Sequence, residues 1–281
     1  MTARVHVTSP GAVESETGSL MYPRVLSDNL ARRPGVVISA SSEAPGWPAR
    51  AALSDNTYER WRANVSAQFH WWILDIGTAQ PCNACAVAAH NLFSTGARSF
   101  VIGSSDDGTN WHSAVGSTPI HSDAPLLFLF AQQVRRYWRL SMHSTDGVGL
   151  WTPTIGHIRF GRALTLQHGI AGPYVPLDYA RRVVVSPSRS EGGQWLGASV
   201  RRTGQRSDVQ ISGLTWDWWR THGDPFVREA RDRARPFFFA WSPARAPQDV
   251  AYCTLDADVE PAHRAGDLVD VTLSLSGFAG P

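Results

Sequence analysis

The stretch Trp71-Trp72-Ile73-Leu74-Asp75-Ile76-Gly77 decides the fold class of this chain. Its apolar side chains alternate toward a core as on an extended strand, and Asp75 and Gly77 close it with residues typical of turns. Short runs of Val, Ile, Phe and Trp, separated by Gly, Pro, Asp and Asn, recur on both sides of it. The sequence therefore predicts a mainly β protein. We expect strands at 36–39, 71–76, 86–89, 99–104, 137–142 and 154–160 and, in the second half, at 180–186, 195–201, 208–214, 237–241 and 268–276.

A single segment, 225–235, has the pattern of a helix. Asp224 can cap it, Pro225 suits the first turn, and Pro236 prevents its continuation. Apolar residues recur at positions 226, 230 and 234, four apart. We expect one surface helix.

Composition excludes several classes of function. The 281 residues carry 26 basic and 24 acidic side chains, a net charge of +2, so we expect no sequence-specific nucleic-acid binding. Every basic residue is an arginine, which excludes a Schiff-base lysine and a phosphate-binding Gly-Lys motif. The longest apolar runs are far shorter than the ~20 residues of a membrane span.

Neither a metal nor a cofactor is predicted. Cys82-Asn-Ala-Cys85 has the spacing of half a zinc site, but Cys253 is the only other cysteine and no paired histidines accompany them. Nucleophile elbows, zinc helices and dinucleotide motifs are absent, and the acidic pairs lie in turns or in the N-terminal tail. We therefore expect no catalytic residues and no enzyme activity.

Composition also divides the chain. Gly169, Gly172, Pro173 and Pro176 interrupt the apolar periodicity between two strand-rich blocks. We expect an N-terminal arm at 1–21, a β-sandwich at 22–164, a linker at 165–178 and a β-barrel with the helix at 179–281. The arm is expected to add a strand to a neighbour or to become ordered on assembly.

The first block carries an ordered series of landmarks. Besides the stretch 71–77, they are Ser39-Ala-Ser-Ser42, 48–56, Trp61, 104–111, Arg136-Tyr-Trp-Arg-Leu140 and Ile155-Gly-His-Ile-Arg-Phe-Gly161. From Tyr22 to about Arg162 this order resembles the discoidin, or coagulation factor 5/8 type C, family of galactose-binding-like domains. The resemblance implies an antiparallel jelly-roll β-sandwich.

The same resemblance implies a ligand site in loops at one end of the sandwich, here 43–50, 55–62 and 89–97. Trp47 and Trp61 are candidates to stack on a sugar ring, with hydrogen bonds from Arg50, His90 and Asn91. The alternative is that Trp61 packs in the core and Trp47 covers a loop.

The second block resembles tail proteins of long-tailed bacteriophages. The similarity rests on the order of Gly192-Gly-Gln-Trp-Leu-Gly-Ala198, the helix, Pro236-Phe-Phe-Phe-Ala-Trp241, Val250-Ala-Tyr-Cys253 and Leu268-Val-Asp-Val-Thr-Leu273. It implies a tail-tube-like barrel that forms a ring, such as a hexamer or a trimer. Arg201, Arg202 and Arg206, in an expected loop at 201–207, are candidates for the assembly interface; the alternative is a solvated hairpin tip.

Together these resemblances predict a structural virion protein of a phage tail tip or baseplate, assembled in the bacterial cytoplasm and placed in the tail. Its partners would be itself, other tail proteins and a cell-surface glycan. The alternative is a lectin-like carbohydrate-binding module protein without a virion role. A glycan-cleaving enzyme is the third hypothesis.

Overall fold

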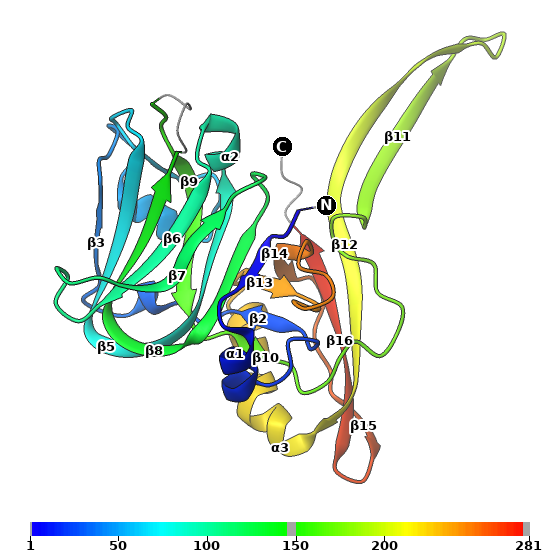
Figure 1. The fold of residues 1–281 in the computed structure, drawn as a ribbon. Helices are drawn as coiled ribbons and strands as arrows, with labels where there is room; N and C mark the ends of the chain where they lie inside the picture. The colour runs from blue at the N-terminus through cyan, green and yellow to red at the C-terminus, as the bar shows by residue number, and fades with distance from the viewer. Residues whose placement is uncertain (1, 145–149, 278–281) are drawn as a thin grey trace.

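The chain is mainly β, as predicted, and the described residues form two large sheets that lie side by side (Figure 1). The computed structural model describes residues 2–144 and 150–277, with only the backbone at 202–203. The strands of the first sheet are β1 Val5–Val7, β3 Val37–Ala40, β4 Trp61–Arg62, β5 Phe69–His90, β6 Ser99–Ser105, β7 His112–Pro119, β8 Leu126–His143 and β9 Thr154–Gly161. Those of the second are β2 Arg24–Leu26, β10 Leu164–Thr165, β11 Arg181–Arg189, β12 Trp195–Thr215, β13 Phe237–Ala240, β14 Val250–Leu255, β15 Ala262–Ala265 and β16 Leu268–Gly277.

The first sheet runs β4-β9-β5-β8-β6-β7 and folds over its own core. Strands β5 and β8 pair with each other along most of their length. The register of this pairing shifts between Asp75 and Gln80. There Gly77 has φ +75°, and its N–H donates to the Asp75 carboxylate at 2.8 Å. Each of these long strands joins two apolar runs of the sequence, because β5 and β8 pair up to Asp75 and again from Gln80 onward, on either side of the bend. The two layers enclose aromatic side chains, among which Trp72 stacks on Phe160 at 6.4 Å.

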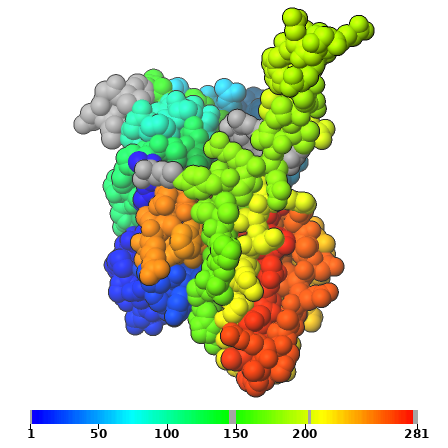
Figure 2. Space-filling view, turned by 90° about the vertical axis from the view of Figure 1, so that its right-hand side faces the viewer, coloured from blue at the N-terminus to red at the C-terminus, as the bar shows by residue number. Residues whose placement is uncertain are grey.

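The second sheet runs β10-β2-β13-β14-β16-β12-β11 and extends beyond the body as a two-stranded hairpin. Figure 2 shows this hairpin, β11 with the first half of β12, rising from the rest of the surface. We expected a loop at 201–207, but these residues lie inside β12. Their backbone is paired on both sides of a register shift at Thr203: β11 is the partner up to Gln205, where β16 takes over.

The helix of the second block is longer than predicted. It comprises α3 Trp216–Trp218, η3 Trp219–Gly223, α4 Asp224–Val227 and η4 Arg228–Asp232, which follow one another without a break. It begins after Thr215, whose side chain accepts from the Trp218 N–H at 3.2 Å, and so Thr215 caps it rather than Asp224. The π-helical turn η3 just before Pro225 accommodates a residue that lacks an N–H. The other helices are short: α1 Pro10–Thr17, η1 Leu30–Arg32, η2 Ala49–Leu53 and α2 Leu92–Thr95.

A third apolar cluster joins the two sheets. Ala84, Ala86 and Ala88 of β5 face it, while Cys85 and Val87 face the core of the sandwich. Both faces of this part of β5 are buried, and its small side chains allow the second sheet to approach closely. The other members of the cluster come from β2, β8, β13, β14 and the N-terminal segment. They are Leu26, Leu127, Leu129, Phe238, Ala240, Val250, Tyr252, Val5, Val13 and Leu20.

The N-terminal segment is ordered on its own chain. Strand β1 pairs in parallel with residues 127–129 of β8, and α1 lies beside it (Figure 1). We expected this arm to pair with a neighbour; here Val5 and Val13 are buried in the third cluster instead. Residues 24–26, which we placed in the sandwich, pair with β13 of the second sheet. In the described part of the chain, no helix has the length and apolarity needed to cross a membrane.

Candidate functional site

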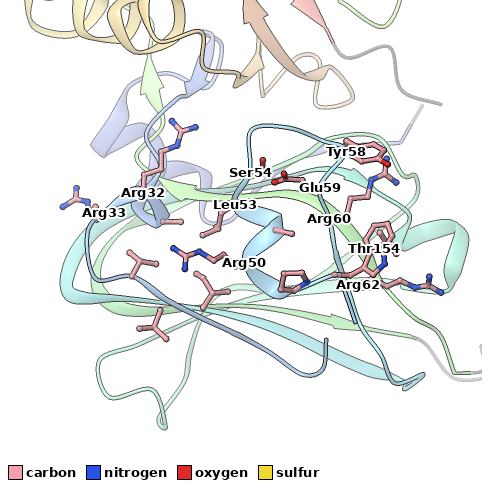
Figure 3. Close-up of a pocket in the computed structure, with 18 of the residues that line it drawn as sticks. Arg32, Arg33, Arg50, Leu53, Ser54, Tyr58, Glu59, Arg60, Arg62 and Thr154 are labelled. Carbon is pink, nitrogen blue, oxygen red and sulfur yellow. The ribbon is translucent and has the colours of Figure 1, made fainter. Parts of the chain in front are cut away.

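A cavity of about 1610 Å³ opens on one side of the sandwich. Its walls come from three segments, 31–38, 46–54 and 58–62, and from Thr154 of β9 (Figure 3). Arg235 of the second block also lines it. Two of these segments are loops that the family resemblance associates with ligands. The cavity is therefore the candidate binding site.

Helix η2 carries Arg50 to the wall of the cavity. Ala49 and Ala52 are buried on one side of this short helix, and the Trp72 indole N–H donates to the Ala49 carbonyl at 3.0 Å. The Glu43 side chain accepts from the Ala49 N–H at 3.0 Å. With its backbone anchored in this way, η2 leaves the Arg50 side chain exposed beside the cavity (Figure 3).

Strand β4 separates a core residue from a surface residue. Trp61 is fully buried, and its indole N–H donates to the Ser42 carbonyl at 3.0 Å. The next residue, Arg62, is exposed and lines the cavity. The Arg62 N–H donates to the Trp47 carbonyl at 3.3 Å, which places these two residues side by side. Trp47 is 38% exposed, so part of this aromatic residue is accessible to a ligand.

Arginines dominate the charge of the cavity. Six line it, and Glu59 is the only acidic residue among the lining residues. Two form ion pairs: Arg32 pairs with Asp55 and with Glu229 (3.3 Å), and Arg235 pairs with Glu229. The remaining four, Arg33, Arg50, Arg60 and Arg62, form no ion pair with any described residue.

The structure brings together two of the five predicted glycan-binding residues. Trp47 and Arg50 line the cavity, while Trp61 packs in the core behind it. His90 is buried, with its Nε2 3.0 Å from the Ala124 carbonyl, and burial lowers its pKa to about 4 against the opposing effect of Asp123. Asn91 does not line the cavity, but its side chain accepts from the N–H of Thr154, which does, at 2.8 Å.

Several residues that line the cavity were not predicted from the sequence as binding residues. Tyr58 is 84% exposed, and Arg60 and Arg62 follow it closely in the chain. The pair Arg32-Arg33 and the pattern Arg60-Trp-Arg62 are local arginine clusters that could have drawn attention to this region. No sequence signal links them to Arg235, which only the folding of the second block brings here.

The three predicted assembly residues belong to β12, away from this cavity. Arg201 is exposed on the hairpin, and Arg206 pairs with Asp256. The side chain of Arg202 lies outside the described part of the structure. Within the described residues, no group of three His, Cys, Asp or Glu side chains is arranged to hold a metal ion, and the three cysteines are buried thiols.

Several solved structures are similar to about half of this chain. A chitosan-binding module of a chitosanase/glucanase from Paenibacillus sp. IK-5 is 21% identical; the alignment covers 48% of this chain and 99% of the module, with a TM-score of 0.40. A GH29 fucosidase from Ruminococcus gnavus is 14% identical over 51% of this chain and 28% of its own, with a TM-score of 0.43. A Clostridium perfringens protein solved with GalNAc-β-1,3-galactose is 14% identical over 45% of this chain and 95% of its own, with a TM-score of 0.39.

No curated protein matches the chain. The family model of the F5/8 type C domain matches residues 37–153, which include most of the cavity wall and exclude the whole second block. Residues 37–153 of this protein are therefore an F5/8 type C domain.

Proposed function

We propose that this protein binds a carbohydrate in the cavity of its F5/8 type C domain, without cleaving it. The observation that carries the proposal is the partly exposed ring of Trp47 beside the outward side chains of Arg50 and Arg62. A flat aromatic face contacts the apolar side of a sugar ring, and guanidinium groups donate hydrogen bonds to its oxygens. Tyr58 adds a second exposed ring at the mouth of the cavity.

A glycan array probed with the full chain, followed by calorimetric titration, tests the proposal. We expect Trp47→Ala to weaken binding by about tenfold, taking as a guide the about 1–3 kcal/mol that an aromatic side chain contributes when a nucleobase stacks on it. Phe93→Ala is the matched control, because Phe93 is 37% exposed and lies on the same domain outside the cavity. Loss of binding in Phe93→Ala alone would place the site at the 91–97 loop instead, and release of reducing sugar ends would show an enzyme.

A second candidate function, self-assembly, is favoured by the projecting hairpin. Cross-strand pairs share a face of a β-ribbon, so Val185 with Val200 and Pro187 with Ala198 form one apolar face, which also includes Val183. All five side chains are exposed. An isolated two-stranded ribbon is marginally stable in water, and among the described residues no strand pairs with the outer edge of β11.

We propose that a second copy of this chain covers this apolar face, as in the ring-forming tail-tip component that the sequence predicted. Light scattering is expected to show an oligomer that the double substitution Val185→Ser with Val200→Ser dissociates. Val184→Ser is the control, because Val184 is similarly exposed on the opposite face of the ribbon. A wild-type monomer at micromolar concentration would refute assembly, and antibody labelling of phage tails separates a virion protein from a free oligomer.

A further inference from the structure

A site for a neutral sugar needs side-chain acceptors as well as donors, because each hydroxyl group both donates and accepts hydrogen bonds. The cavity is instead rich in donors, because its side-chain acceptors are limited to Glu59 and the hydroxyl groups of Ser54, Tyr58 and Thr154. Arginine side chains only donate, and six of them line it, whereas Glu59 supplies its one carboxylate. This excess of donors is unexplained by a neutral ligand.

The individual partners of the arginines show where positive charge is left over. Arg33 donates to the neutral Gln80 side chain, and the Arg60 Nε donates to the Thr57 carbonyl at 3.0 Å. Neither contact neutralises a charge. Arg50 and Arg62 are exposed and have no hydrogen-bond or ion-pair partner for their side chains among the described residues. Both are therefore available to a ligand.

The positions of these side chains suit a ligand with more than one negative charge. In Figure 3, Arg32, Arg33 and Arg50 lie toward one end of the cavity, and Arg60 and Arg62 lie toward the other, near Tyr58. The volume of about 1610 Å³ exceeds the roughly 300–1,000 Å³ of sites for single small molecules. Several sugar units in a row would fill it.

Building on the carbohydrate-binding function proposed above, we infer that the ligand is an anionic polysaccharide whose carboxylate or sulfate groups pair with Arg50 and Arg62. A planar guanidinium group forms two parallel hydrogen bonds with such an anion, and these charge-assisted bonds are stronger than bonds to a hydroxyl. Trp47, which lies beside Arg62, and Tyr58, at the same end of the cavity, contact the sugar rings. The aromatic rings favour a polysaccharide over an acidic peptide, which offers no comparable flat apolar ring.

Two pairs of polymers that differ only in charge test this inference on the full chain. Polygalacturonate is compared with its fully methyl-esterified form, and dextran sulfate with dextran, by calorimetric titration. We expect one or both charged polymers to bind, and each neutral partner to bind at least about tenfold more weakly. The charged polymer that binds shows whether carboxylate or sulfate is recognised. Binding should weaken as salt rises.

Variants localise the effect. Arg50→Ala and Arg62→Ala are each expected to weaken binding of the charged polymer about tenfold. The unfolding temperature should stay unchanged, because neither side chain has a partner among the described residues. Arg245→Ala is the matched control, since Arg245 is an exposed arginine of the second block outside the cavity. Polyglutamate serves as an anion without sugar rings.

The possible outcomes separate this inference from the function on which it rests. Equal binding of charged and neutral polymers, or binding of neutral glycans alone, overturns the anionic ligand but leaves carbohydrate binding in place. Equal binding of polyglutamate and polygalacturonate shows a general anion-binding surface and also overturns it. If no polymer or array glycan binds, both the inference and the proposed function fail.

Discussion

Arg159 of β9 is a fully buried arginine at the junction of the two sheets. Its guanidinium group donates to the Leu26 carbonyl at 3.0 Å, to the Pro236 carbonyl at 2.9 Å and to the His157 Nε2 at 3.2 Å. Burial lowers its pKa to about 10, so it remains charged at neutral pH. The sandwich is thus bound to β2 and to the start of β13 through one side chain.

Arg159→Met is expected to destabilise the protein by about 3 kcal/mol, because it leaves buried carbonyl groups without a donor. Urea unfolding followed by tryptophan fluorescence measures the loss. Arg245→Met is the control, since it replaces an exposed arginine with the same side chain. Equal unfolding midpoints for the two variants would show that the buried hydrogen bonds contribute nothing net.

His90 gives the stability a pH dependence. Burial lowers its folded-state pKa to about 4, whereas the unfolded side chain titrates near 6.5. Below about pH 6.5 the unfolded chain binds a proton that the folded chain does not. The free energy of unfolding therefore decreases as the pH is lowered from about 6.5 to about 4. The same direction applies to His157, whose pKa is lowered by burial and then by Arg159.

Between pH 7 and pH 5, His90 is expected to account for about 2 kcal/mol of lost stability. His90→Gln removes the titrating group and keeps a donor for the Ala124 carbonyl, so its unfolding free energy should fall less over this interval. His112→Gln, at an exposed position, is the control. Parallel pH profiles for wild type and His90→Gln would contradict the assignment.

Among the elements, the helix 216–232 depends on the residue before it. Thr215 ends β12 and also caps the helix, with its side chain accepting from the Trp218 N–H. The helix packs across the core of the second block, where Phe226 meets Phe237 edge to face at 5.0 Å.

Thr215→Ala is expected to cost about 1 kcal/mol, the usual contribution of a lost helix cap. Thr215→Ser keeps the hydroxyl acceptor and should retain most of the stability. Thermal unfolding of both variants measures the difference. A larger loss in the Ser variant than in the Ala variant would mean that the Thr methyl group matters more than the cap.

In the whole molecule, the third apolar cluster makes one body of two strand-rich blocks. The N-terminal segment contributes to this cluster from outside both blocks, through Val5, Val13 and Leu20. The blocks are thus expected to unfold together rather than one after the other.

Val13→Asp is expected to cost more than about 2 kcal/mol, because it buries an unpaired charge between the sheets. Ala12→Asp introduces the same charge at an exposed position of the same helix and should change little. Differential scanning calorimetry measures both the unfolding temperature and the number of transitions. An unchanged unfolding temperature in Val13→Asp would show that the N-terminal segment is not part of the stable core.

The fold class and the family of one domain could be predicted from the sequence alone. Alternating apolar residues report which strand positions are buried, and Gly, Pro, Asp and Asn report turns, so the mainly β class follows from local patterns. The F5/8 type C resemblance follows from the order of such patterns. The same turn residues concealed the long strands, because Gly77 at a bend looks like Gly at a strand end. The run 84–88 lacks alternation, which is the signal of burial on both faces.

The cavity and its charge were decided by the tertiary structure. The sequence does not distinguish an arginine that is ion-paired, as Arg32 is with Asp55 and Glu229, from one without a partner among the described residues, such as Arg50. Trp47 and Trp61 likewise look equivalent in sequence, yet one faces the cavity and the other is fully buried. Local periodicity determines which elements form, but partners distant in the sequence are chosen only by packing, and it is these partners that set the free charge of a site.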